Sequence, residues 1–111
     1  MNQLDNASFR DLNEMTAVVA QKFFYAKKIK LLDHVPFIGE LGFTDVASIN
    51  SFLEKVEEAY KTLNDLEKNL INNEFFYQSY NQWWEPLYSK ASFYRYKKEA
   101  MQKFLEAIYE L

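Results

Sequence analysis

The chain contains no cysteine, only two glycines and only two prolines among its 111 residues. Without cysteine it has no thiol nucleophile, no disulfide and no zinc–thiolate site, and a reducing, cytoplasmic location is expected. So few glycines and prolines leave few positions that interrupt a helix, which favours long helices over short strands. No apolar run approaches the roughly 20 residues of a membrane span, and acids and amides near the N-terminus do not resemble a signal peptide. A soluble protein without membrane insertion is therefore expected.

Histidine occurs once, at His34, and this scarcity disfavours metal sites and nucleophilic catalysis. A di-iron site in a helical bundle needs Glu-x-x-His pairs, yet Leu31 stands three residues before His34. Glu54 and Glu58 share a helix face, as solvated acids commonly do. The segment 39–42 carries an acid where a phosphate-binding loop would benefit from a basic group. We therefore expect no enzymatic activity, no metal and no cofactor.

Apolar residues recur at helical spacing through most of the chain and indicate helices with one broad apolar face. Ser8 and Asp11 resemble a capping box, and a helix should stop before each of Pro36 and Pro86 because the residue before proline avoids the helical region. Ser89 or Ser92 is placed to begin the last helix. The expected helices cover residues 8–33, 45–71, 74–85 and 89–111, with an apolar loop at residues 34–44.

These helices predict a single all-α domain spanning residues 1–111 and folded as an antiparallel four-helix bundle. Within the second helix, apolar residues follow a regular 4-3-4-3-4 spacing, at Phe52, Val56, Ala59, Leu63, Leu66 and Leu70. Three asparagines among residues 69–73 favour a turn there, with Asn72 or Asn73 capping the next helix. If no turn forms, residues 45–85 make one helix of roughly 60 Å, which predicts three helices and a dimer.

Charge is distributed unevenly along the chain. The formal net charge is −3, which argues against general nucleic-acid binding. Residues 36–85 carry a local charge of −6, between +1 for residues 1–35 and +2 for residues 86–111. An acidic middle is therefore flanked by two mildly basic ends.

In an up-down-up-down bundle the end of the first helix, the long loop and the start of the fourth helix would meet at one end. Basic side chains, aromatic rings and the longest loop would then be combined, and loops on a rigid scaffold commonly carry function. Trp83 and Trp84 lie about 100° apart on a helix, so one of the two should be partly exposed. The candidate binding residues are Lys27, Lys28, Lys30, Phe37, Phe43, Trp83, Trp84, Tyr88, Lys90, Arg95, Lys97 and Lys98.

The leading functional prediction is a non-enzymatic protein-binding module, such as a small intracellular regulator, inhibitor or adaptor, that acts through this aromatic and basic end. Its partner is another protein of unknown identity, and a homodimer is one form of the same prediction. Aromatic residues make up 18% of the chain, and most of them are expected to fill the core. They also allow an alternative, a small-molecule or lipid-binding helical bundle with an aromatic-lined pocket.

Overall fold

A computed structural model describes residues 3–32, 46–77 and 79–109, and within these ranges all regular structure is helical. The prediction of an all-α helical bundle with four α-helices is confirmed. In chain order the elements are the 3₁₀-helix η1 (Gln3–Asn6), α1 (Phe9–Leu32), α2 (Val46–Lys61), α3 (Asp65–Ile71), the π-helix η2 (Asn72–Phe76) and α4 (Lys90–Tyr109).

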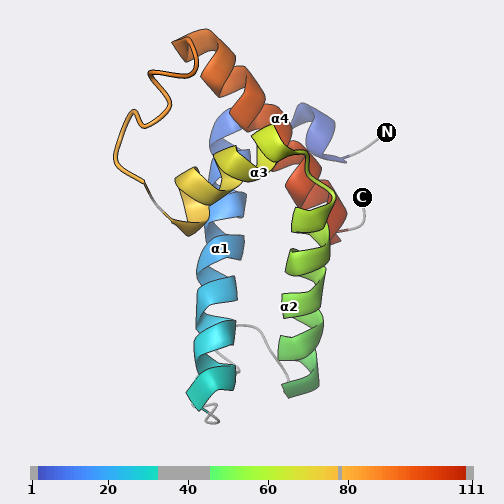
Figure 1. Ribbon diagram of the computed structural model, residues 1–111. Helices are drawn as coiled ribbons and strands as arrows, with labels where there is room; N and C mark the ends of the chain where they lie inside the picture. The colour runs from blue at the N-terminus through green and yellow to red at the C-terminus, as the bar shows by residue number, and fades with distance from the viewer. Residues whose placement is uncertain (1–2, 33–45, 78, 110–111) are drawn as a thin grey trace.

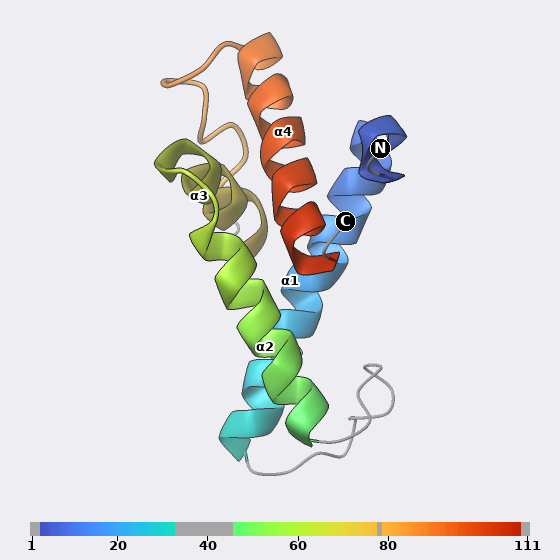
Figure 2. The same ribbon diagram turned by 90° about the vertical axis from the view of Figure 1, so that its right-hand side faces the viewer.

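Helices α1 and α2 lie side by side and run in opposite directions (Figure 1). The end of α1 and the start of α2 lie together at the bottom of Figure 1. The short helix α3 crosses the opposite end, and α4 packs against α1, α2 and α3 (Figures 1 and 2). None of the helices in the described ranges is long and apolar enough to cross a lipid bilayer.

Every α-helix contributes fully buried side chains to the core, and these include Leu12, Val56, Leu70, Phe93 and Phe104. The regular seam predicted within residues 45–71 is packed as expected, with its six members buried or partly buried. One polar side chain, that of Thr16, is completely buried, and its hydroxyl donates to the Leu12 carbonyl at 2.7 Å. The hydroxyl therefore enters the core without losing its hydrogen bond.

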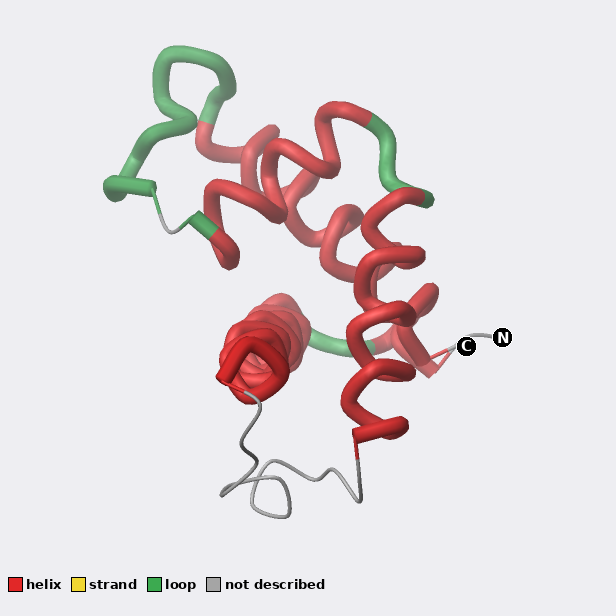
Figure 3. Tube along the Cα trace, turned by 60° about the horizontal axis from the view of Figure 1, so that its bottom comes forward, coloured by secondary structure: helices red, strands yellow, loops and turns green. Residues whose placement is uncertain are grey.

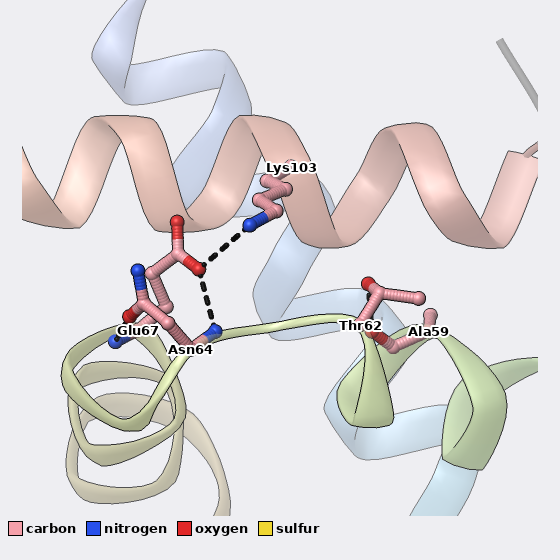
Figure 4. Close-up of polar contacts among 5 residues, drawn as sticks. All are labelled: Ala59, Thr62, Asn64, Glu67 and Lys103. Carbon is pink, nitrogen blue, oxygen red and sulfur yellow. Dashed lines mark hydrogen bonds and ion pairs between the residues drawn. The ribbon is translucent and has the colours of Figure 1, made fainter.

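The helix is interrupted at residues 62–64. The prediction of a single helix over residues 45–71 is therefore wrong, and so is the alternative of a continuous helix over residues 45–85. The backbone of Asn64 is extended, and its side chain accepts from the Glu67 N–H at 2.8 Å while its own N–H donates to the Glu67 carboxylate at 2.8 Å. This reciprocal capping box starts α3. Figure 4 shows that Lys103 of α4 reaches the same carboxylate, at 3.0 Å, so the cap is also tied to the neighbouring helix.

The turn predicted at residues 69–74 is also wrong, because α3 continues directly into η2. The Asn72 side chain donates to the Tyr60 hydroxyl, and the Asn73 side chain donates to the Asn69 carbonyl at 2.8 Å. The Tyr77 N–H donates to the Asn72 carbonyl at 2.7 Å, an i to i+5 bond. Since these asparagines find partners in the helical conformation, they do not need to end the helix.

The helix predicted over residues 74–85 ends at Phe76 instead, and residues 79–89 form a series of turns. Gln82 in this segment has a φ of 63°, in the left-handed region. The two serine caps are placed as expected, because Ser8 accepts from the Asp11 N–H at 3.1 Å and Ser89 accepts from the Ser92 N–H at 3.2 Å. The predicted loop at residues 34–44 lies outside the described residues.

Candidate functional site

The structure divides the predicted site between two ends of the bundle. The lysines near the end of α1 lie at the bottom of Figure 1, whereas the 79–89 segment and the start of α4 lie at the top. Figure 3, in which loops and turns are green, shows the long non-helical segment 79–89 projecting at the edge of the molecule. The predicted meeting at one end is therefore wrong for Lys27 and Lys30, because α3 crosses the bundle instead of returning the chain along its length.

The three lysines of α1 have different surroundings. Lys27 forms an ion pair with Glu57 of α2 at 3.5 Å, and Lys30 borders an open hollow between these two helices. Lys28 borders a different hollow, on the face of α1 that looks toward Lys97. Phe37 and Phe43, the two loop residues of the predicted site, lie outside the described residues.

Seven of the predicted residues, from Trp83 to Lys98, do lie on the 79–89 segment and the first half of α4. Two of them, Trp83 and Lys97, contact Glu74 of η2. We call these three side chains the Glu74 cluster. The Lys97 ammonium donates to one oxygen of the Glu74 carboxylate at 2.7 Å, and the Trp83 indole N–H donates to the other at 2.7 Å. The Lys97 and Glu74 side chains are only 11% and 20% exposed. The carboxylate of η2 thus ties the turns to α4 in a largely desolvated position.

Aromatic rings enclose the Lys97 ammonium. It lies 5.4 Å from the ring centre of Phe9, 5.1 Å from that of Phe75 and 6.0 Å from that of Phe93. Contacts of this kind stabilise a cation that has left water. Lys97 is therefore a structural member of the site, fixed by one carboxylate and three rings, rather than an exposed binding residue.

The two tryptophans differ in exposure, as the sequence predicts, although they lie in turns and not in a helix. Trp83 is buried, with 8% of its surface exposed. Trp84 is partly exposed and stacks on Phe93, with ring centres 4.4 Å apart and ring planes 10° apart. Tyr88 packs edge-on against Tyr96 at 5.8 Å. These contacts hold the segment against α4 at several points along its length.

The same segment presents apolar and aromatic side chains to solvent. Tyr80 is 74% exposed and Leu87 is 61% exposed, while Tyr94 on the adjoining turn of α4 is 42% exposed. Three predicted basic residues lie nearby on α4, namely Lys90, Arg95 and Lys98, and the Arg95 guanidinium lies 5.0 Å from the Tyr96 ring. We call the exposed and partly exposed apolar and aromatic side chains of the 79–89 segment and the adjoining turn of α4 the turn surface, namely Tyr80, Trp84, Leu87, Tyr88 and Tyr94.

A second concave region, which the sequence does not reveal, lies between α1, α2 and the α3–η2 helix. We call it the aromatic groove. Its volume is about 600 Å³ and most of its lining is apolar. The residues that line it are Phe23, Phe24, Val56, Glu57, Tyr60, Lys61, Lys68, Asn72, Phe76 and Tyr77. The helical period of the sequence places Phe23 on an apolar face, but only the tertiary arrangement shows that it borders an open space.

The described residues contain no group of three or more acids, histidines or cysteines that could hold a metal ion. Comparison with protein-family models, curated proteins and solved structures gives no match for this chain.

Proposed function

We propose that the chain is a non-enzymatic protein-binding module, a small intracellular regulator, inhibitor or adaptor, that binds its partner through the turn surface. One observation carries this proposal, namely that a non-helical segment is held firmly from within while it exposes apolar side chains. Trp83 is fixed by Glu74 and Trp84 by Phe93, yet Tyr80 and Leu87 point largely into water. A preformed surface loses less conformational entropy on binding, and aromatic residues are common binding anchors.

The charge near the turn surface indicates what its partner offers. Lys90, Arg95 and Lys98 lie on the first half of α4, and residues 86–111 carry a local charge of +2. A partner with an apolar patch bordered by acidic residues would complement this arrangement, because charge at the rim of an interface steers association. Self-association through the same surface is the homodimeric form of the proposal.

Site-specific photocrosslinking in the cells that produce the protein tests this proposal. A photoreactive phenylalanine in place of Tyr80 should give a discrete crosslinked product, whereas the same residue in place of Tyr109 should not. Tyr109 is a matched control because it is 50% exposed but lies at the other end of α4. Equal crosslinking at both positions, or at neither, would contradict the assignment.

Paired substitutions provide a second readout. Tyr80→Ser with Leu87→Ser should abolish the crosslinked complex, or the self-association seen by sedimentation velocity. Val18→Ser with Leu31→Ser should leave it intact, because these exposed residues of α1 lie outside the turn surface. If both double variants lose the complex equally, non-specific hydrophobic association explains the result and the turn surface is not the binding site.

A further inference from the structure

On its α3–η2 side the aromatic groove runs from polar to aromatic residues. Lys68, Asn72 and Phe76 follow one another at intervals of four residues along α3 and η2 and all three line the groove. On the polar part of this side the Lys68 ammonium lies 5.6 Å from the ring centre of Tyr60, whose hydroxyl accepts from the Asn72 amide. Lys68 and Asn72 thus place polar groups one to two helical turns from Phe76, while the Glu57–Lys27 pair lies beside Phe23 on the side of α1 and α2.

The aromatic part of the groove is built from phenylalanine rings. Phe76 contacts Phe23 edge-on at 5.6 Å and Phe24 at 5.8 Å. Val56 of α2 is buried beneath the groove lining. These contacts form an apolar floor to which several elements contribute, so its shape does not depend on a single flexible side chain.

Charge is balanced along the groove except at Lys68. Glu57 is paired with Lys27 at 3.5 Å, and Lys61 is paired with Glu58 at 3.1 Å. Among the residues that the structure describes, no carboxylate pairs with Lys68. A partly buried ammonium at the edge of an apolar groove is complementary to an anion that carries an apolar body.

We propose that the aromatic groove binds a small amphiphilic carboxylate, whose acid group pairs with Lys68 and whose apolar body lies on Phe23, Phe24 and Phe76. The site is separate from the proposed protein-binding function, because the groove and the turn surface share no residue. Its volume of about 600 Å³ lies within the range of known small-molecule sites, which are mostly apolar with a few polar groups that fix orientation.

The charge of the groove favours a small carboxylate over a segment of another protein. The unpaired charge is a single ammonium, whereas the remaining charged side chains of the lining are already paired with neighbours.

Three probes of equal chain length test the proposal, namely octanoate, octanol and octylammonium, titrated into the ¹⁵N-labelled full chain and followed by amide chemical shifts. Octanoate should perturb the amides of Tyr60 and of residues 68–77, and should bind at least threefold more tightly than octanol. Octylammonium should bind most weakly. Equal affinity for octanoate and octanol would overturn the proposal, as would perturbations centred on another part of the chain.

Matched variants separate the contribution of the charge from that of the apolar floor. Lys68→Gln should weaken octanoate binding roughly threefold to tenfold, the range for a partly exposed ion pair, and should leave octanol binding unchanged. Lys55→Gln is the control, because this lysine is exposed on α2 outside the groove, and it should change neither. Phe24→Ala should weaken both ligands.

If Lys68→Gln and Lys55→Gln weaken octanoate equally, the effect is one of net charge and the proposed pairing is wrong. If none of the octyl compounds shifts the groove amides, the groove does not bind amphiphiles, and a peptide or protein segment becomes its candidate occupant. Neither result would bear on the turn surface, whose crosslinking test is independent.

Discussion

Removing one member of the Glu74–Lys97 pair should destabilise the fold far more than removing an exposed ion pair. The variants are Glu74→Gln, Lys97→Met and the two combined, compared with Glu58→Gln, Lys61→Met and their combination. The first pair is 20% and 11% exposed, whereas the Glu58 and Lys61 side chains are 72% and 69% exposed. Both pairs join a glutamate to a lysine, at 2.7 and 3.1 Å. The first is largely buried, joins η2 to α4 and includes a bond from Trp83, whereas the second is exposed and joins residues three apart on α2.

The expected magnitude follows from that burial. Breaking a fully buried pair costs about 3–5 kcal/mol, because the remaining charge is left without a partner in a poorly solvated place. The Glu74–Lys97 pair keeps some contact with water, so each single variant should lower the free energy of unfolding by about 2–3 kcal/mol. The double variant leaves no unpaired charge and should cost less than the sum, with a coupling of about 1–2 kcal/mol. For Glu58–Lys61 the coupling should stay below about 0.5 kcal/mol.

Urea denaturation followed by circular dichroism at the helical minimum measures these free energies. A domain of this size has a total stability of about 5–15 kcal/mol, so each variant should remain folded enough for a complete transition. Tryptophan fluorescence supplies a second readout, because Trp83 donates to the same carboxylate. A coupling for Glu74–Lys97 no larger than that for Glu58–Lys61 would refute the view that the Glu74 cluster fixes the turns against α4.

Three further substitutions, with Leu31→Ala as an exposed control, test the fold at separate points in the same assay. Trp84→Ala removes a ring stacked on Phe93 at 4.4 Å and should cost about 2–3 kcal/mol, and a loss below about 1 kcal/mol would contradict the packed turn. Asn64→Ala removes the cap of α3 and should cost about 1 kcal/mol, with no effect expected if α2 and α3 were one helix. Phe104→Ala empties a fully buried position and should cost about 3–5 kcal/mol. Leu31→Ala, at an 85% exposed position, should change stability by less than about 0.5 kcal/mol, and equal effects of these two would refute the assignment of the core.

The regular apolar spacing within residues 45–71 correctly predicts which side chains of this segment face the core, but it does not report where a helix is continuous. Phe52, Val56, Ala59 and Leu63 keep their regular spacing up to the break and are buried or partly buried in the structure. Leu63 itself lies within residues 62–64, where the chain leaves the helix. Burial depends on the direction in which a side chain points. The backbone can leave the helical conformation while the next apolar side chain still points into the core.

A local signal for this break is present in the sequence. Asn64 is followed three residues later by Glu67, the spacing of a capping box, and the structure shows both of its hydrogen bonds. The asparagines at positions 72 and 73 give the opposite result, because their side chains find partners within the folded helix. One of those partners, Tyr60, lies twelve residues away on another helix. Short-range capping chemistry can be read from sequence, whereas such distant pairing cannot.

The prediction of the candidate site also depended on where the helices end and in which direction they run. Trp84, Tyr88 and Lys90 could be recognised from residue type and are brought together around one hollow between the turns and the start of α4. Placing Lys27 and Lys30 beside them required the third helix to run back along the bundle, whereas the α3–η2 helix crosses its end. The wrong topology therefore placed residues from two separate parts of the bundle in one predicted site.

The π-helix η2 is the element that supports both candidate surfaces. Asn72 and Phe76 line the aromatic groove, while Glu74, between them, holds Trp83 of the adjoining turns and Lys97 of α4. π-Helical turns are uncommon and are found frequently at functional sites. Here the wide turn is fixed by side chains on both sides, through Tyr60 toward the groove and Lys97 toward the turns. The five residues of η2 therefore determine the position of the groove lining and of the turn surface together, although the two surfaces have no residue in common.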